Sequence, residues 1–219
     1  TWHAGSPALC DWMIEDLLDT LQNRREASEN DNDPNLNTTD MIRTKQDYRR
    51  CLQTEIVRRG FWRDLLFREP TARFLLWLRR TEYHCNARGP WHRAAFLYCY
   101  LRYRRISLRT GISIPKNVCR EGLTIPHYGS IVVNAACRIG RNCAIHNNVN
   151  IGASGGGIAA PRIGDNVYIG PGAVLYGDIE IADNCYIGAN AVVNRSFTEP
   201  GSVIAGVPAR VVRHDDRVW

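Results

Sequence analysis

Between Val133 and Val193 an aliphatic residue returns at every sixth position, always in the same phase. Ten of the eleven positions hold Val, Ile or Leu, and the remaining one holds Gly: Val133, Ile139, Ile145, Ile151, Gly157, Ile163, Ile169, Leu175, Ile181, Ile187 and Val193. A fixed short period indicates a repeat architecture, in which each unit buries its apolar side chain against its neighbours. An ordinary β-sandwich would instead show alternation with period two and turns every 8–12 residues.

The residues between these aliphatic positions favour tight corners. Asn, Asp and Gly tolerate positive φ, and they recur between the apolar positions at Asn142, Asn147-Asn148, Asp165-Asn166, Asp183-Asn184 and Asn190. Three hexads of about 18 residues then make one triangular coil. We therefore predict a mostly β fold, a left-handed parallel β-helix, with α-helices before it. Its handedness is an exception to the right-handed crossover rule.

Cysteines occupy the second inward position of several hexads. Cys137, Cys143 and Cys185 share this position, and Cys119 extends the phase, so Cys119 is expected to stack on Cys137 one coil away. The eight cysteines form no CxxC pair. Free buried cysteines in a reducing cytoplasm are therefore the favoured interpretation.

The first half of the chain has helical rather than hexad periodicity, and we divide the chain at residues 40 and 110. Residues 1–40 are predicted to form an acidic helix and a polar linker. In residues 41–110 we expect helices at about 41–58, 61–84 and 91–108. Thr39 or Asp40 would cap the first, Pro70 would interrupt the second, and Gly111 would end the third. Residues 111–219 would form the β-helix.

The charge is uneven along the chain. The net charge is +6, although residues 1–40 hold nine acidic residues and only two arginines. No apolar run is long enough to span a membrane, and no segment has the layout of a signal peptide, which favours a cytoplasmic location. The basic remainder suits anionic small molecules, phosphorylated carriers or a membrane surface. Without a nucleic-acid-binding motif, we do not expect a nucleic acid partner.

Four features interrupt the repeat and are candidates for function. His127 stands where extrapolation of the phase requires an aliphatic residue, and His146 follows the inward Ile145. Residues 153–157 are Gly-rich, and the run AGVPAR at 205–210 ends the repeats. Each has a plainer interpretation: an irregular first coil, an exposed corner histidine, a simple loop and a terminus. No carboxylate is spaced with the histidines as a metal ligand, so no metal site is expected.

The hexads, the run IPHYGSIVV and the ending IAGVPARVV resemble the hexapeptide-repeat acyltransferases. Within them the sequence is most similar to the serine acetyltransferase family, especially its branch associated with polysaccharide gene clusters, over about residues 41–213. The resemblance implies a homotrimer or a multiple of one, with acetyl-CoA as co-substrate in a groove between adjacent β-helices. It also implies His127 as general base, a role that neutral imidazole suits near pH 7. His146 is a second catalytic candidate, and a backbone N–H of the Gly-rich stretch would stabilise the oxyanion.

The resemblance also implies a set of cofactor contacts. Two residues would line the pantetheine arm, two would lie near the adenosine phosphates, and two arginines would lie next to them: Pro171, Ala189, Asn194, Arg195, Arg210 and Arg213. Arginine suits phosphate because it stays charged and offers a fork of donors.

Three positions depart from the serine acetyltransferase pattern. An acid that orients the catalytic His falls on Ile112, an acid before that His falls on Pro126, and a second, serine-holding His falls on Ala160. A saccharide hydroxyl needs only neutral hydrogen bonds, whereas serine needs charged partners. We therefore expect an acetyl-CoA-dependent O-acetyltransferase acting on a saccharide or related small acceptor. The alternatives are serine O-acetylation for cysteine synthesis and a non-catalytic trimeric scaffold, in which His127 would be buried and the groove near Arg195 blocked.

Overall fold

The computed structural model describes residues 41–57, 69–155 and 157–214. The chain divides into two compact units, Thr1–Asp40 and Met41–Trp219, and all described residues belong to the second. The predicted acidic helix and linker, with the proposed cap residues Thr39 and Asp40, lie outside the described residues. Most of the predicted start of the second helix, residues 61–68, also lies outside them.

The first described helix, α2 (Lys45–Leu52), begins later than predicted because Thr44 caps it. The Thr44 side chain accepts a hydrogen bond from the Asp47 backbone N–H at 3.1 Å, and the Asp47 carboxylate accepts one from the Thr44 N–H at 3.0 Å. This reciprocal pair satisfies two N–H groups that the first turn would otherwise leave open. The helix continues as a short π-helix, η2 (Gln53–Val57).

Two longer helices follow, and proline begins each of them. Pro70 is the first residue of α4 (Pro70–Asn86) and Pro90 the first of α5 (Pro90–Thr110). The sequence predicts an interruption at Pro70, but the first turn of a helix leaves its N–H groups without intrahelical partners, so proline, which has no N–H, is favoured there. The predicted stop at Gly111 is confirmed, since Gly111 takes the left-handed conformation that closes α5.

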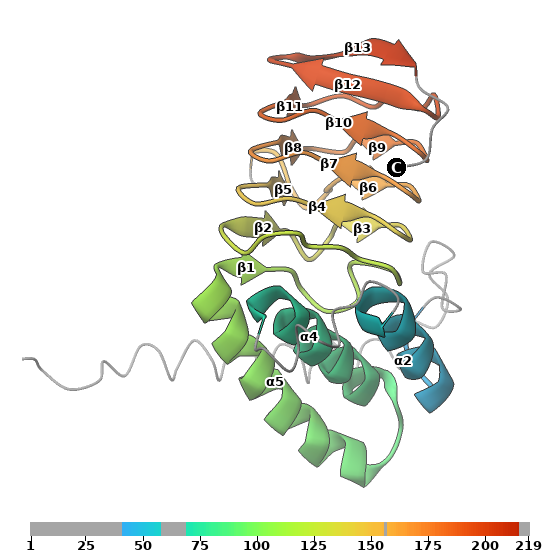
Figure 1. Cartoon of the computed structure of the whole chain (residues 1–219), viewed down its shortest axis with the longest axis vertical. Helices are drawn as coiled ribbons and strands as arrows, with labels where there is room; N and C mark the ends of the chain where they lie inside the picture. The colour runs from blue at the N-terminus through green and yellow to red at the C-terminus, as the bar shows by residue number, and fades with distance from the viewer. Residues whose placement is uncertain (1–40, 58–68, 156, 215–219) are drawn as a thin grey trace, which may run out of the picture. The chain divides into compact units, whose positions relative to one another are not determined.

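Thirteen strands make up the described part of the repeat region (Figure 1). They are β1 (Ile112–Ser113), β2 (Ile131–Val133), β3 (Arg138–Ile139), β4 (Ala144–Ile145), β5 (Asn150–Gly152), β6 (Arg162–Ile163), β7 (Tyr168–Ile169), β8 (Val174–Tyr176), β9 (Glu180–Ile181), β10 (Tyr186–Ile187), β11 (Val192–Val193), β12 (Ser202–Gly206) and β13 (Ala209–His214).

The strands form three sheets, one for each side of a triangular coil. Sheet A has the order β1-β2-β5-β8-β11, sheet B the order β3-β6-β9, and sheet C the order β13-β12-β10-β7-β4. All pairs are parallel except β12 with β13, which close the stack as an antiparallel pair. Successive coils therefore rise from α4 and α5 toward β13 (Figure 1).

The hexad phase and the corners are confirmed over most of the stack. The predicted inward aliphatics are buried, and Ile145, Ile151, Ile169 and Leu175 are each 0% exposed. Asn142, Asn148, Asn166, Asn184 and Asn190 all adopt positive φ at corners. The side chains of Asn142, Asn166 and Asn184 also form a ladder, with hydrogen bonds of 3.2 and 3.0 Å between successive coils.

The phase fails at the first coil, where two predictions were wrong. Cys119 pairs with Ile139 and Thr124 with Ala144, each 20 residues apart rather than 18. Cys119 therefore does not stack on Cys137. The same shift puts Ile125 inside, at 0% exposure, and leaves His127 exposed at the following corner. The extra length of this coil, rather than a replaced core residue, explains the histidine.

The Gly-rich stretch is an insertion one hexad long. Ile139 pairs with Ile163, 24 residues later, whereas Ile163 pairs with Ile181 at the regular 18. Because the extra six residues equal one repeat, the phase continues through Gly157 although Gly157 is exposed and belongs to no strand.

Candidate functional site

The two candidate histidines lie close together on adjacent coils. His127 is exposed and lies in the corner between sheets C and A, which we call the C–A edge, and His146 follows β4 at the same edge one coil later. Their ring centroids are 6.3 Å apart in an edge-on arrangement. His146 is half-buried, and burial together with His127 lowers its pKa below the ordinary histidine value. His146 is therefore held neutral, a form that can accept or donate a proton.

A column of outward-facing rings continues from His146 across sheet C. The His146 ring lies 4.8 Å from Tyr168, and Tyr168 stacks on Tyr186 at 4.3 Å with the rings only 4° from parallel. Burial, followed by a hydrogen bond with Tyr186, raises the pKa of Tyr168 to about 12. We did not identify the tyrosines from the sequence, although their spacing of 18 and their place just before an inward residue would have revealed the column.

Hydrocarbon side chains occupy all three positions where the resemblance implies charged groups, and two of them are buried. Ile112 in β1 is 0% exposed, and Ala160 is also buried. Pro126 is half-buried beside His127. In the same coil the hydroxyl of Thr124 is a buried side-chain group without a hydrogen-bond partner among the described residues. A buried hydroxyl of this kind is costly unless a ligand, water or another chain satisfies it.

One backbone N–H of the Gly-rich insertion already donates a hydrogen bond within the insertion. The Gly157 N–H donates to the Ser154 carbonyl at 2.8 Å, so it closes a turn rather than facing outward. Gly155 has φ of +55° and no heavy atom within 4 Å of the position a Cβ would take. The backbone at Gly155 therefore faces open space and not a packed neighbour.

Two of the predicted cofactor residues share the C–A edge with the histidines. Pro171 follows β7 and Ala189 follows β10, one coil apart, and the Asn190 N–H donates to the Pro171 carbonyl at 2.9 Å. Pro171 is half-buried and Ala189 exposed. The structure thus brings the predicted pantetheine residues and His127 onto one edge of the β-helix.

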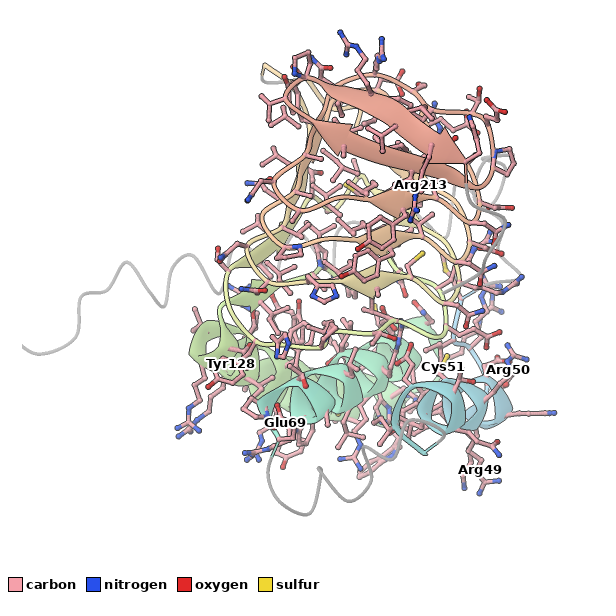
Figure 2. All side chains as sticks on the ribbon, turned by 45° about the horizontal axis from the view of Figure 1, so that its top comes forward. Arg49, Arg50, Cys51, Glu69, Tyr128 and Arg213 are labelled. Carbon is pink, nitrogen blue, oxygen red and sulfur yellow. The ribbon has the colours of Figure 1, made fainter. Side chains whose placement is uncertain are left out.

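The predicted phosphate residues lie elsewhere. Asn194 and Arg195 follow β11 at the corner between sheets A and B, where the Arg195 guanidinium lies 5.2 Å from the centre of the Phe197 ring. Arg210 and Arg213 lie on β13 of sheet C (Arg213 is labelled in Figure 2). Arg213 pairs with Val203, and Val203 pairs with Tyr186, so Arg213 continues the register of the ring column. One protomer therefore does not place Arg195 at the edge that carries His127.

Within residues 41–57, 69–155 and 157–214, no group of three or more His, Cys, Asp or Glu side chains is arranged to hold a metal ion. No helix in that part of the chain is both long and apolar enough to cross a bilayer.

Comparison with known proteins agrees with this architecture. Residues 160–195 match the bacterial transferase hexapeptide (six repeats) family model. The chain is 40% identical over 111 residues to a serine acetyltransferase of Staphylococcus xylosus, covering 49% of this chain and 51% of the relative. It is 35% identical over 132 residues to a serine acetyltransferase of Mycobacterium tuberculosis, covering 59% and 57%.

A solved structure of soybean serine acetyltransferase in complex with serine superposes with a TM-score of 0.57 at 25% identity, covering 77% of this chain and 70% of that one. The chain spans about half the length of the curated relatives named above. These likenesses fit the predicted left-handed β-helix with a helical region before it, and they relate the chain to the hexapeptide-repeat acyltransferases.

Proposed function

We propose that the protein is an acetyl-CoA-dependent O-acetyltransferase and that L-serine is its first candidate acceptor. The observation that carries the proposal is the accessible His127, beside a neutral His146, on the edge of a hexapeptide β-helix that resembles serine acetyltransferases. The curated relatives named above are serine acetyltransferases, so they favour serine over the saccharide that we expected from the sequence.

The chemistry requires a base at the acceptor hydroxyl. The His127 imidazole would take the hydroxyl proton while the oxygen attacks the thioester carbonyl of acetyl-CoA. The C–O bond forms and the C–S bond breaks. The His127 imidazolium would then give the proton to the departing thiolate, which leaves free CoA and the acetyl ester. His146 would stay neutral beside His127, so it would not raise the cost of the imidazolium that forms.

A saccharide hydroxyl remains the second candidate because of two specific positions. Ile112 and Ala160 are buried hydrocarbon where the resemblance implies an acid and a histidine. A site without these groups offers less to the ammonium and carboxylate of serine than to a neutral hydroxyl compound. A non-catalytic scaffold has less support, because it predicts a buried His127 and a blocked Arg195, and both residues are exposed.

The cofactor would lie along the C–A edge in contact with Pro171 and Ala189. Arg195 and Asn194, at the A–B corner, could reach the phosphates of the same cofactor only from a second copy. This placement supports the proposed homotrimer, in which one protomer supplies the base and its neighbour supplies phosphate contacts. Arg210 and Arg213 would complete the basic surroundings from β13.

Release of free thiol from acetyl-CoA tests the proposal when it is measured with L-serine and with a panel of sugars. We expect release to require an acceptor and to be fastest with serine. His127→Asn keeps a polar side chain but removes the basic nitrogen, and loss of a general base costs about 10²–10⁴ in rate. His146→Asn is the matched control and should cost less.

Each result bears on a separate part of the proposal. A sugar with higher kcat/KM than serine would establish the second candidate. No thiol release with any acceptor would favour the scaffold, and release without an acceptor would indicate hydrolysis of the thioester instead of transfer to a hydroxyl. Wild-type turnover in His127→Asn with an inactive His146→Asn would make His146 the base.

A further inference from the structure

The helix α5 has two distinct long faces, and only one of them is packed. Its inner face is buried against the rest of the protein through residues spaced three and four apart: Phe96, Cys99, Tyr100, Tyr103, Ile106, Ser107 and Thr110. On the opposite side lie Ala94, Leu97, Leu101 and Leu108, which we call the outer stripe. At 3.6 residues per turn these four fall within about 60° of one another around the helix axis.

The outer stripe is unusually exposed for apolar side chains. Leu97 and Leu101 are each 44% exposed and Leu108 is 73% exposed, while Trp91, in the first turn, is 74% exposed. Single exposed apolar residues are ordinary on protein surfaces, but several of them along one side of the same helix, even with Arg104 and Arg105 in the turn between Leu101 and Leu108, indicate a binding surface.

Arginines flank this stripe on both sides. The helix holds five arginines and no acidic residue. Arg93 is exposed on one flank, and Arg105 and Arg109 are exposed on the other. Their long side chains can lie along an apolar surface and still place the guanidinium at a polar boundary.

We propose that the outer stripe of α5 binds the surface of an anionic phospholipid bilayer, independently of the proposed acetyl transfer. Exposed leucines with cationic flanks and a terminal tryptophan suit contact with a membrane interface, where apolar side chains enter the acyl boundary and arginines meet anionic headgroups. The helix would lie on the bilayer rather than cross it, since the described helices include none fit to span it.

The charge on α5 favours this occupant over a second copy of the same helix. Pairing of two α5 helices across a two-fold axis would bring arginine rows together without any acid on either helix to neutralise them, and like charges across an interface oppose association. Anionic headgroups instead match the arginines, and acyl chains accept the leucines.

Vesicle co-sedimentation with the full chain tests the proposal. We expect binding to vesicles of phosphatidylcholine mixed with phosphatidylglycerol, weak binding to phosphatidylcholine alone, and loss of binding in high salt because the arginine contribution is screened. Arg105→Gln should lower the partition coefficient about fivefold, the value of one basic residue near an anionic surface. Leu108→Gln should lower it about tenfold, because burial of a leucine contributes on this scale.

Matched controls lie on the β-helix, far along the chain from α5. Ile158→Gln removes an apolar side chain that is 92% exposed, and Arg138→Gln removes an exposed arginine on β3. Neither should change vesicle binding. Circular dichroism of every variant should match the parent, since all four side chains are exposed.

Three outcomes would overturn the proposal. Equal binding to neutral and anionic vesicles would show that the arginines do not contribute to it. Binding that survives Leu108→Gln and Arg105→Gln but falls in a control variant would place the contact on another surface. If Leu108→Gln leaves vesicle binding unchanged and lowers the oligomer size in sedimentation, the stripe is a subunit interface instead.

Discussion

The prediction with the largest expected effect concerns Arg79, an almost fully buried arginine that joins α4 to the first coil. Its Nε and Nη2 donate to the Glu55 carboxylate at 2.7–3.2 Å, and its Nη1 donates to Glu82 at 2.7 Å. The remaining donors reach the backbone carbonyls of Cys119 and Arg120 at 2.9 and 2.7 Å. One side chain therefore holds two carboxylates and the turn that leads toward His127.

The carboxylates also accept backbone donors of that turn. Glu55 accepts from the Gly122 and Leu123 N–H groups at 3.0 and 3.1 Å, and Glu82 accepts from the Asn117 N–H at 2.8 Å. Burial raises the pKa of Glu82, and the neighbouring Arg79 opposes that rise. Arg79→Met fills a similar volume but leaves two buried carboxylates and two carbonyls without their cation. Removal of one partner from a buried ion pair typically costs about 3–5 kcal/mol.

Urea unfolding with matched thermal scans measures this loss. In a chain of this size about 3–5 kcal/mol corresponds to a fall of roughly 6–20 °C in Tm. Arg50→Met is the control, because Arg50 pairs with Glu121 of the same coil at 2.7 Å but is 58% exposed. Surface pairs contribute about 0–1 kcal/mol. Equal small losses in both variants would refute the idea that the buried network holds the helices to the β-helix.

Three further predictions concern the cofactor, the acidic segment and pH. Arg195→Ala should raise the KM for acetyl-CoA about five- to a hundredfold and leave the acceptor KM unchanged; an unchanged acetyl-CoA KM would assign the phosphates to other residues. Removal of residues 1–40 should leave oligomer size and thiol release intact, and an insoluble product would show that the segment belongs to the core. His84 and His92 place their Nδ1 atoms 3.0 Å apart, and burial, then His92 and Arg80, lowers the pKa of His84. The stability from neutral His84 should therefore be present above its ordinary pKa of about 6.5 and be lost as pH falls through the lower folded value. The urea midpoint should drop on acidification toward about pH 5 and drop less in His92→Asn; identical drops in both proteins would contradict this.

The repeat made most of the β-helix predictable because its side chains obey one local rule. Each inward aliphatic stacks on the same position one coil away. The pairing of Ile163 with Ile181 is therefore repeated along the regular part of the stack. Corner asparagines such as Asn166 are likewise fixed by their positive φ. Helix bounds were less predictable, since the start of α2 depends on the Thr44 and Asp47 pair rather than on its apolar spacing. The ring column of Tyr168 and Tyr186 was not predicted, because the hexad period identifies only the inward positions and these tyrosines point outward.

The two irregular coils show why periodicity located the candidate base for the wrong reason. A strict period of six assigns His127 to the core. A histidine in a position that otherwise holds an aliphatic residue would then suggest a functional role. The structure removes the anomaly, because the long first coil returns an aliphatic, Ile125, to the core and turns His127 outward. The histidine is therefore free to act because the coil is longer, not because a core residue was replaced. The six-residue insertion before Ile163 has the opposite effect on the sequence, since it keeps the phase while it adds an exposed loop between β5 and β6. Departures in coil length thus mark the candidate site more directly than departures in residue type. Removal of Gly129 and Ser130, which keeps His127 but shortens the coil by two residues, should accordingly preserve the fold and abolish thiol release. Retained activity in that deletion variant would show that the length of the first coil does not place the base.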